Sequence, residues 1–69
     1  MKPPYYPLYL TPREREVCLL VAELKSTPWI AHELGISIRT VEKHIYSASR
    51  QIPGRGQPMK KIIRHFTTT

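Results

Sequence analysis

Apolar side chains recur at helical spacing in the first third of the chain, and the residues before them carry the signals of a helix start. Thr11 can accept a hydrogen bond as an N-cap, Pro12 suits the first helical position, and Glu14 can reach back to the cap. The apolar stripe then follows at steps of three and four residues: Val17, Leu20, Val21 and Leu24. This pattern predicts an amphipathic helix over residues 12–24.

A shorter helix is predicted after a break in this pattern. Thr27 and Pro28 repeat the cap-then-proline signal, which predicts a helix over residues 28–34 with Thr27 as its N-cap. Its inner face comprises Ile30, Ala31 and Leu34. Gly35 stands where a helix commonly ends on a residue in the left-handed conformation, and Ile36 can close the corner behind it.

A third helix, over residues 38–51, is predicted to have two chemically distinct faces. Ser37 is its expected N-cap. Because successive residues turn by about 100° around a helix, one side collects the apolar residues Ile38, Val41, Ile45, Ala48 and Ile52. The opposite side carries Arg39, Lys43, Tyr46 and Arg50, flanked by Thr40 and Ser47. A short helix, a glycine-containing turn and a longer helix make a helix-turn-helix, and these cations and hydroxyls suit a DNA major groove.

The remaining segments complete a small all-α domain of four helices over residues 10–66. A last apolar stripe, predicted as a helix over residues 58–66, comprises Met59, Ile62, Ile63 and Phe66. Residues 1–9 contain three prolines and are expected to form an irregular arm. Its candidate aromatic anchors are Tyr5, Tyr6 and Tyr9. Residues 67–69 are expected to fray. The predicted core is Val17, Leu20, Val21, Leu24, Ile30, Ala31, Leu34, Ile36, Val41, Ile45 and Ala48.

Positive charge is concentrated at one end of the chain. Of the net charge of +6, residues 1–42 contribute nothing, because five basic side chains balance five acidic ones. Residues 43–69 hold six basic side chains and no acid. One-sided charge of this kind indicates a polyanionic partner, of which nucleic acid is the commonest, although a basic end can also be only a solvated terminus.

The candidate chemistry does not indicate an enzyme or a metal protein. The single cysteine, Cys18, lies in an apolar run and is expected to be a small buried thiol. His32, His44 and His65 do not share a face with ligand spacing, so neither a metal nor any other cofactor is expected. The first residues lack the continuous apolar stretch of a signal peptide or a membrane span. A cytoplasmic protein without a membrane contact or a small-molecule ligand is expected.

Two motifs carry a resemblance to a known family. The stretches "LTPREREVCLLVAE", residues 10–23, and "IAHELGISIRTVEKHI", residues 30–45, resemble the LuxR/GerE-type helix-turn-helix domain of bacterial transcription regulators. The resemblance implies a four-helix domain whose third helix enters the DNA major groove. It also implies homodimers, often formed through the fourth helix, on inverted half-sites, and RNA polymerase is a candidate partner. The chain has no room for the sensor domain that most such regulators carry, so a stand-alone regulator is expected.

Roles follow for individual residues if the third helix enters DNA, because a recognition helix presents its N-terminal residues to bases and its later turns to the backbone. The residues expected to read bases are Arg39, Glu42, Lys43 and Tyr46. Those expected at phosphates are Thr27, Thr40, His44, Ser47 and Arg50. Those expected at a dimer interface are Met59, Ile62, Ile63 and Phe66; the alternative is that this stripe only closes the core of one chain.

The sequence departs from the family pattern at several positions, which leaves alternative functions open. The family usually reads like "G.SNKEIA" at the second helix, whereas this chain reads "LKSTPWIA", with Trp29 where an acid is common. Glu42 stands where lysine is common. One alternative is a module like region four of a sigma factor, which shares the helix-turn-helix. Another is a protein-interaction adaptor that has kept the fold but lost DNA binding.

Overall fold

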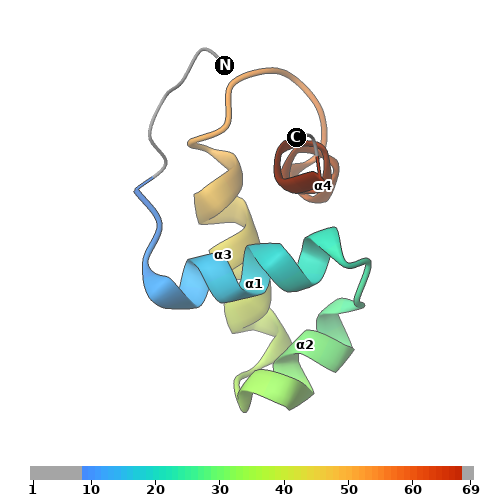
Figure 1. Ribbon diagram of the computed structural model, residues 1–69. Coiled ribbons are helices and arrows are strands. Elements are labelled where there is room, and N and C mark those ends of the chain that lie inside the picture. Colours follow the sequence, from blue (N-terminus) through green and yellow to red (C-terminus); the bar gives the residue numbers. More distant parts are fainter. Residues whose placement is uncertain (1–8, 68–69) are drawn as a thin grey trace.

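The computed structural model describes residues 9–67 and contains four helices and no strand within that range. They are α1 (Pro12–Ala22), α2 (Thr27–Leu34), α3 (Ile38–Ser49) and α4 (Pro58–Thr67) (Figure 1). The predicted all-α class and the four helices are confirmed. α1 and α3 end two residues earlier than predicted, and α4 ends one residue later.

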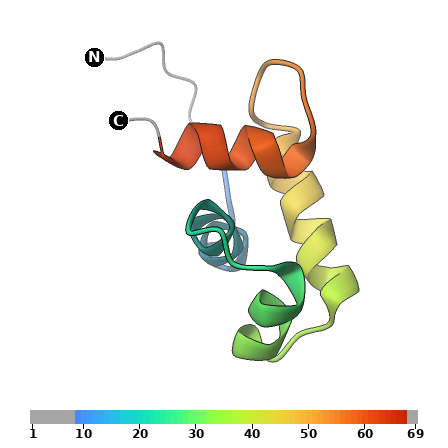
Figure 2. The ribbon, with the colours of Figure 1, turned by 90° about the vertical axis from the view of Figure 1, so that its right-hand side faces the viewer.

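The helices pack around α3 (Figures 1 and 2). α1 crosses in front of α3 in Figure 1, and α2 lies at the N-terminal end of α3, to which the turn connects it. α4 packs on both α1 and α3, and Figure 2 shows its start beside the C-terminal half of α3. Three sides of the core are therefore closed by α1, α3 and α4, while α2 closes the remaining end.

The start of α1 has the predicted capping box. The Thr11 hydroxyl accepts a hydrogen bond from the Glu14 backbone N–H at 3.1 Å, and a Glu14 carboxylate oxygen accepts one from the Thr11 N–H at 3.0 Å. Both bonds satisfy N–H groups that a helix start leaves without partners. The start of α1 is thus determined by the local sequence.

The end of α1 differs from the prediction. Leu24 adopts φ +66°, in the left-handed region, and its N–H donates to the Val21 carbonyl at 2.9 Å. The Lys25 N–H donates to the Leu20 carbonyl at 3.1 Å, which completes a Schellman motif. This turn swings Leu24 out of the apolar stripe and leaves its side chain 75% exposed. The prediction that Leu24 belongs to the core is therefore wrong.

α2 and α3 begin on serine caps. Ser26, rather than Thr27, caps α2, because its hydroxyl accepts from the Trp29 N–H at 3.2 Å. The predicted cap at Thr27 is wrong by one residue, and Thr27 is the first residue of the helix. Gly35 has φ +66°, as expected after α2. Ser37 caps α3 as predicted, accepting from the Thr40 N–H at 3.0 Å.

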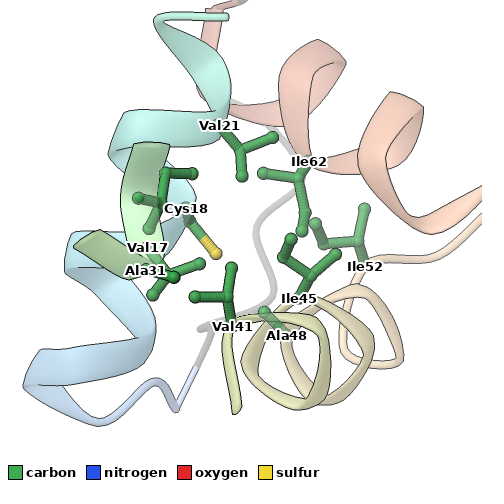
Figure 3. Packing of buried hydrophobic residues seen from close by; sticks show 10 residues of the cluster. Val17, Cys18, Val21, Ala31, Val41, Ile45, Ala48, Ile52 and Ile62 are labelled. Atoms are coloured by element: carbon green, nitrogen blue, oxygen red, sulfur yellow. The ribbon is translucent and has the colours of Figure 1, made fainter. Parts of the chain in front are cut away.

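One hydrophobic core joins all four helices (Figure 3). Its buried members are Val17, Cys18, Val21, Ile30, Ala31, Val41, Ile45, Ala48, Ile52 and Ile62. Partly buried residues packed against it are Leu10, Leu20, Leu34, Ile36, Ile63 and Phe66. Ile38, predicted on the buried side of α3, lies in the first turn of that helix and is 44% exposed. The predicted core is otherwise confirmed, with Leu20, Leu34 and Ile36 at its margin.

The segment before α1 is held by its backbone. A side-chain oxygen of Gln51 accepts from the Tyr9 N–H at 2.7 Å, and the Gln51 amide nitrogen donates to the Tyr9 carbonyl at 3.2 Å. The Tyr9 side chain is exposed, so its predicted role as a packed aromatic anchor is wrong. Tyr5 and Tyr6 lie outside the described residues.

Candidate nucleic-acid interface

The outward face of α3 brings together the residues predicted to read bases. The exposed side chains of Arg39, Glu42, Lys43 and Tyr46, with that of Ser47, border one shallow open hollow of about 430 Å³. In Figure 2, α3 runs along one edge of the molecule, and no other helix lies on its outer side. The predicted base-reading set therefore forms one continuous surface.

The core sets the orientation of this face. Val41, Ile45 and Ala48 are buried on the inner side of α3, so the helix cannot rotate about its axis without exposing them. Their burial directs Lys43 and Tyr46, which lie on the other side of the helix, to solvent. The cap at Ser37 fixes where the helix starts and hence which turn carries each exposed side chain.

The charges on this face are not neutralised within the described part of the chain. Ion pairs join Arg13 to Glu16 at 3.2 Å on α1 and His32 to Glu33 at 3.9 Å on α2, and neither pair involves this face. The guanidinium of Arg50 lies 5.8 Å from the ring centre of Tyr46, in a cation–π contact that holds it beside α3. Arg39 and Lys43 belong to neither ion pair, so their charge is open to a ligand.

The residues predicted to contact phosphates differ in how exposed they are. Ser47 and Arg50 are exposed, whereas Thr27, Thr40 and His44 are partly buried. The Thr40 and Ser47 hydroxyls differ in their surroundings, because that of Thr40 already shares a hydrogen bond of 2.9 Å with the Ser37 hydroxyl. Ser47 and Arg50 are thus the more open members of the set.

A second hollow, which the sequence analysis missed, adjoins the first. It has a volume of about 390 Å³ and is lined by Thr27, Glu42, Ile45, Tyr46, Gln57, Pro58 and Met59. It brings the start of α4 beside α3, and no periodicity within either helix could have revealed that contact.

Ile62, predicted at a dimer interface, is fully buried in the core of one chain; that prediction is wrong for Ile62, since it leaves no surface for a partner.

The other titratable groups do not form a second site. Burial, and secondarily the Glu14 carboxylate, raises the pKa of the Cys18 thiol to about 11, while Arg15 opposes this shift. Cys18 is the buried thiol that was predicted. Within residues 9–67, no three histidine, cysteine or acidic side chains are arranged to hold a metal ion. None of the helices described there has both the length and the apolar composition to cross a membrane.

The fold and this face define a helix-turn-helix DNA-binding protein. The chain matches, over residues 8–53, the family described as bacterial regulatory proteins, luxR family. It is 44% identical over 57 residues to the spore germination protein GerE of Bacillus subtilis (strain 168), an alignment that covers 80% of this chain and 77% of that protein. No solved structure matches the chain. The chain belongs to the luxR family and is a DNA-binding transcription regulator.

Proposed function

We propose that this regulator reads duplex DNA by placing α3 in the major groove, with Arg39, Glu42, Lys43 and Tyr46 toward the base edges. The observation that carries the proposal is their convergence on the one exposed face of a helix whose other face is buried. The major groove is about 12 Å wide and admits an α-helix. Arginine and lysine pair with guanine edges there, and a carboxylate such as that of Glu42 accepts from cytosine N4.

The later and flanking residues contact the backbone in this proposal. Arg50 follows the last turn of α3, and Ser47 is exposed one turn earlier, so both pass toward a phosphate wall of the groove. Thr27, Thr40 and His44 complete the phosphate set from the start of α2 and the sides of α3. Such contacts position the protein without reading sequence.

We further propose a homodimer formed through α4. The support is the partial exposure of Ile63 and Phe66, whose remaining surface extends outward from the core beside Ile62. Two copies related by a two-fold axis would bind half-sites about one helical turn of DNA apart. The regulator would act in the cytoplasm, where it meets its DNA and RNA polymerase. Sedimentation that shows one copy both free and on a selected site would contradict the dimer.

Titration with a random duplex and with a site selected from a random pool, each at two salt concentrations, tests the reading of DNA. Lys43→Ala should cost about 1–3 kcal/mol on the selected site and relax the choice of base at one position. Arg50→Ala should weaken binding equally on both duplexes. The slope of log affinity against log salt should become shallower by about 0.9, which corresponds to one lost phosphate contact. Arg13→Ala, which removes an exposed cation from α1, is the matched control and should change binding little.

Glu42 provides a test of the orientation of α3. Glu42→Lys removes a carboxylate that phosphates repel and adds a cation, so affinity for random DNA should rise. The ratio of the affinity for the selected site to that for random DNA should fall. If neither affinity changes, Glu42 does not face DNA, and the proposed orientation is wrong. If the unaltered protein fails to bind any duplex even at low salt, the adaptor alternative is favoured instead.

A further inference from the structure

The hollow between α3 and the start of α4 has walls of mixed chemistry. Ile45, Tyr46, Pro58 and Met59 supply the apolar part, and the side chain of Met59 is 37% exposed. Thr27, Glu42 and Gln57 supply the polar atoms. A methionine left this open beside an exposed tyrosine is available to pack on a partner rather than on the core.

The position of this hollow relative to α3 determines what could enter it. An α-helix with its side chains is about 10–12 Å across, and the major groove is about 12 Å wide. A helix lying in the groove therefore fills it, and protein segments beside the helix rest on the sugar–phosphate walls. Glu42 and Tyr46 border both hollows, so the hollow at α4 is continuous with the face of α3.

We propose that this hollow seats the sugar–phosphate backbone of one DNA strand, which makes Met59 and Gln57 DNA contacts. Met59 packs against the apolar edge of a deoxyribose, while the Gln57 amide and the Thr27 hydroxyl donate to the flanking phosphates. The Glu42 carboxylate repels phosphate, so the strand passes on the side nearer Gln57 and Thr27. The inference rests on the proposed function, because it requires α3 in the groove.

The chain around α4 favours this occupant over a protein partner. Residues 43–69 contain no acidic side chain, and Arg55 and Lys60 flank the hollow in sequence, both exposed. The backbone contact is independent of base sequence and adds to the positioning of α3.

A substitution that adds charge at the hollow tests the inference. Met59→Lys places a cation on the proposed path of the strand, so the slope of log affinity against log salt should steepen by about 0.9. Affinity should then fall about 3-fold more than that of the unaltered chain between 50 and 200 mM salt, on selected and random duplexes alike. Gln57→Lys, in the exposed segment before α4, should act in the same direction and provides a second variant if Met59→Lys does not fold.

Leu19→Lys is the matched control, because Leu19 is 47% exposed on the outward side of α1 and does not line the hollow. It adds the same net charge and should leave the slope nearly unchanged. If the folded variants at Met59 and Gln57 behave like Leu19→Lys while Lys43→Ala still weakens binding, the inference is overturned and the proposed function stands. If Lys43→Ala also has no effect, the proposed function fails. Loss of a two-copy complex by Met59→Lys would assign Met59 to a protein interface and overturn the inference.

Discussion

Leu24 is held in a backbone conformation that suits glycine, and replacing it should stabilise the domain. Its φ of +66° completes the Schellman motif at the end of α1, through the hydrogen bond from the Lys25 N–H to the Leu20 carbonyl. An L-residue in this conformation brings its Cβ close to the following carbonyl oxygen, whereas glycine has no Cβ. The side chain is 75% exposed, so its removal sacrifices little buried area.

The expected gain for Leu24→Gly is the difference between two opposing effects. Relief of the left-handed conformation contributes about 1–2 kcal/mol. The greater freedom of glycine in the unfolded chain offsets about 0.4–1 kcal/mol of this. The difference lies between about 0 and 1.6 kcal/mol, with a midpoint of about 0.8 kcal/mol. A rise of about 0.8 kcal/mol in the free energy of unfolding raises the Tm of a domain of this size by about 3–6 °C.

Thermal and urea unfolding followed by far-UV circular dichroism measures this gain, and Leu24→Ala is the control. Alanine removes the exposed apolar side chain but keeps the Cβ, so it should give none of the gain that comes from conformational relief. The reasoning is refuted if Leu24→Gly is no more stable than Leu24→Ala. A similar gain in both variants would mean that the exposed side chain, and not the backbone, is unfavourable.

Three further predictions concern the core and the caps. Ile62→Ala should lower the free energy of unfolding by about 2–5 kcal/mol, measured by urea denaturation, if α4 belongs to the core as observed. Ser26→Ala should cost about 1 kcal/mol, and Thr27→Ala clearly less in the same assay; the reverse order would restore Thr27 as the cap. Burial raises the pKa of Cys18 from 9.0 to about 11, so between these pH values the thiol loses its proton in the unfolded chain but keeps it in the folded one. The free energy of unfolding should therefore be unaffected by this group below pH 9 and fall as the pH rises from 9 toward 11. In urea denaturation, the free energy of unfolding of Cys18→Ala should fall less between pH 9 and pH 11 than that of the unaltered protein.

Local features were predictable where the interactions that produce them join residues within one turn of the chain. The capping box of Thr11 and Glu14, the left-handed Gly35 and the Ser37 cap each depend on residues within three or four positions. The two faces of α3 were predictable for the same reason, because helical periodicity alone separates Val41 from Lys43. The four residues expected to read bases consequently lie together on one surface.

The predictions failed where a local signal had two interpretations. Leu24 continues the apolar stripe of α1 by spacing, but the chain leaves the helix at Ala22 and turns it to solvent. Ser26 and Thr27 are both good caps, and the helix begins on the earlier one, Ser26. Ile38 has the right phase for burial, yet at the first turn of α3 it is 44% exposed.

The sequence by itself determined four helices, the starts of three of them, a buried side for each and a cationic outer face on α3, because these follow from hydrogen bonding and periodicity over a few residues. Tertiary structure decided what covers each buried side. Ile62 and Met59 belong to the same apolar stripe of α4, but α1 and α3 bury the first, and the second lies open beside Glu42 and Tyr46. An apolar stripe indicates that a surface needs a partner, and only the packing of distant segments chooses which partner it meets.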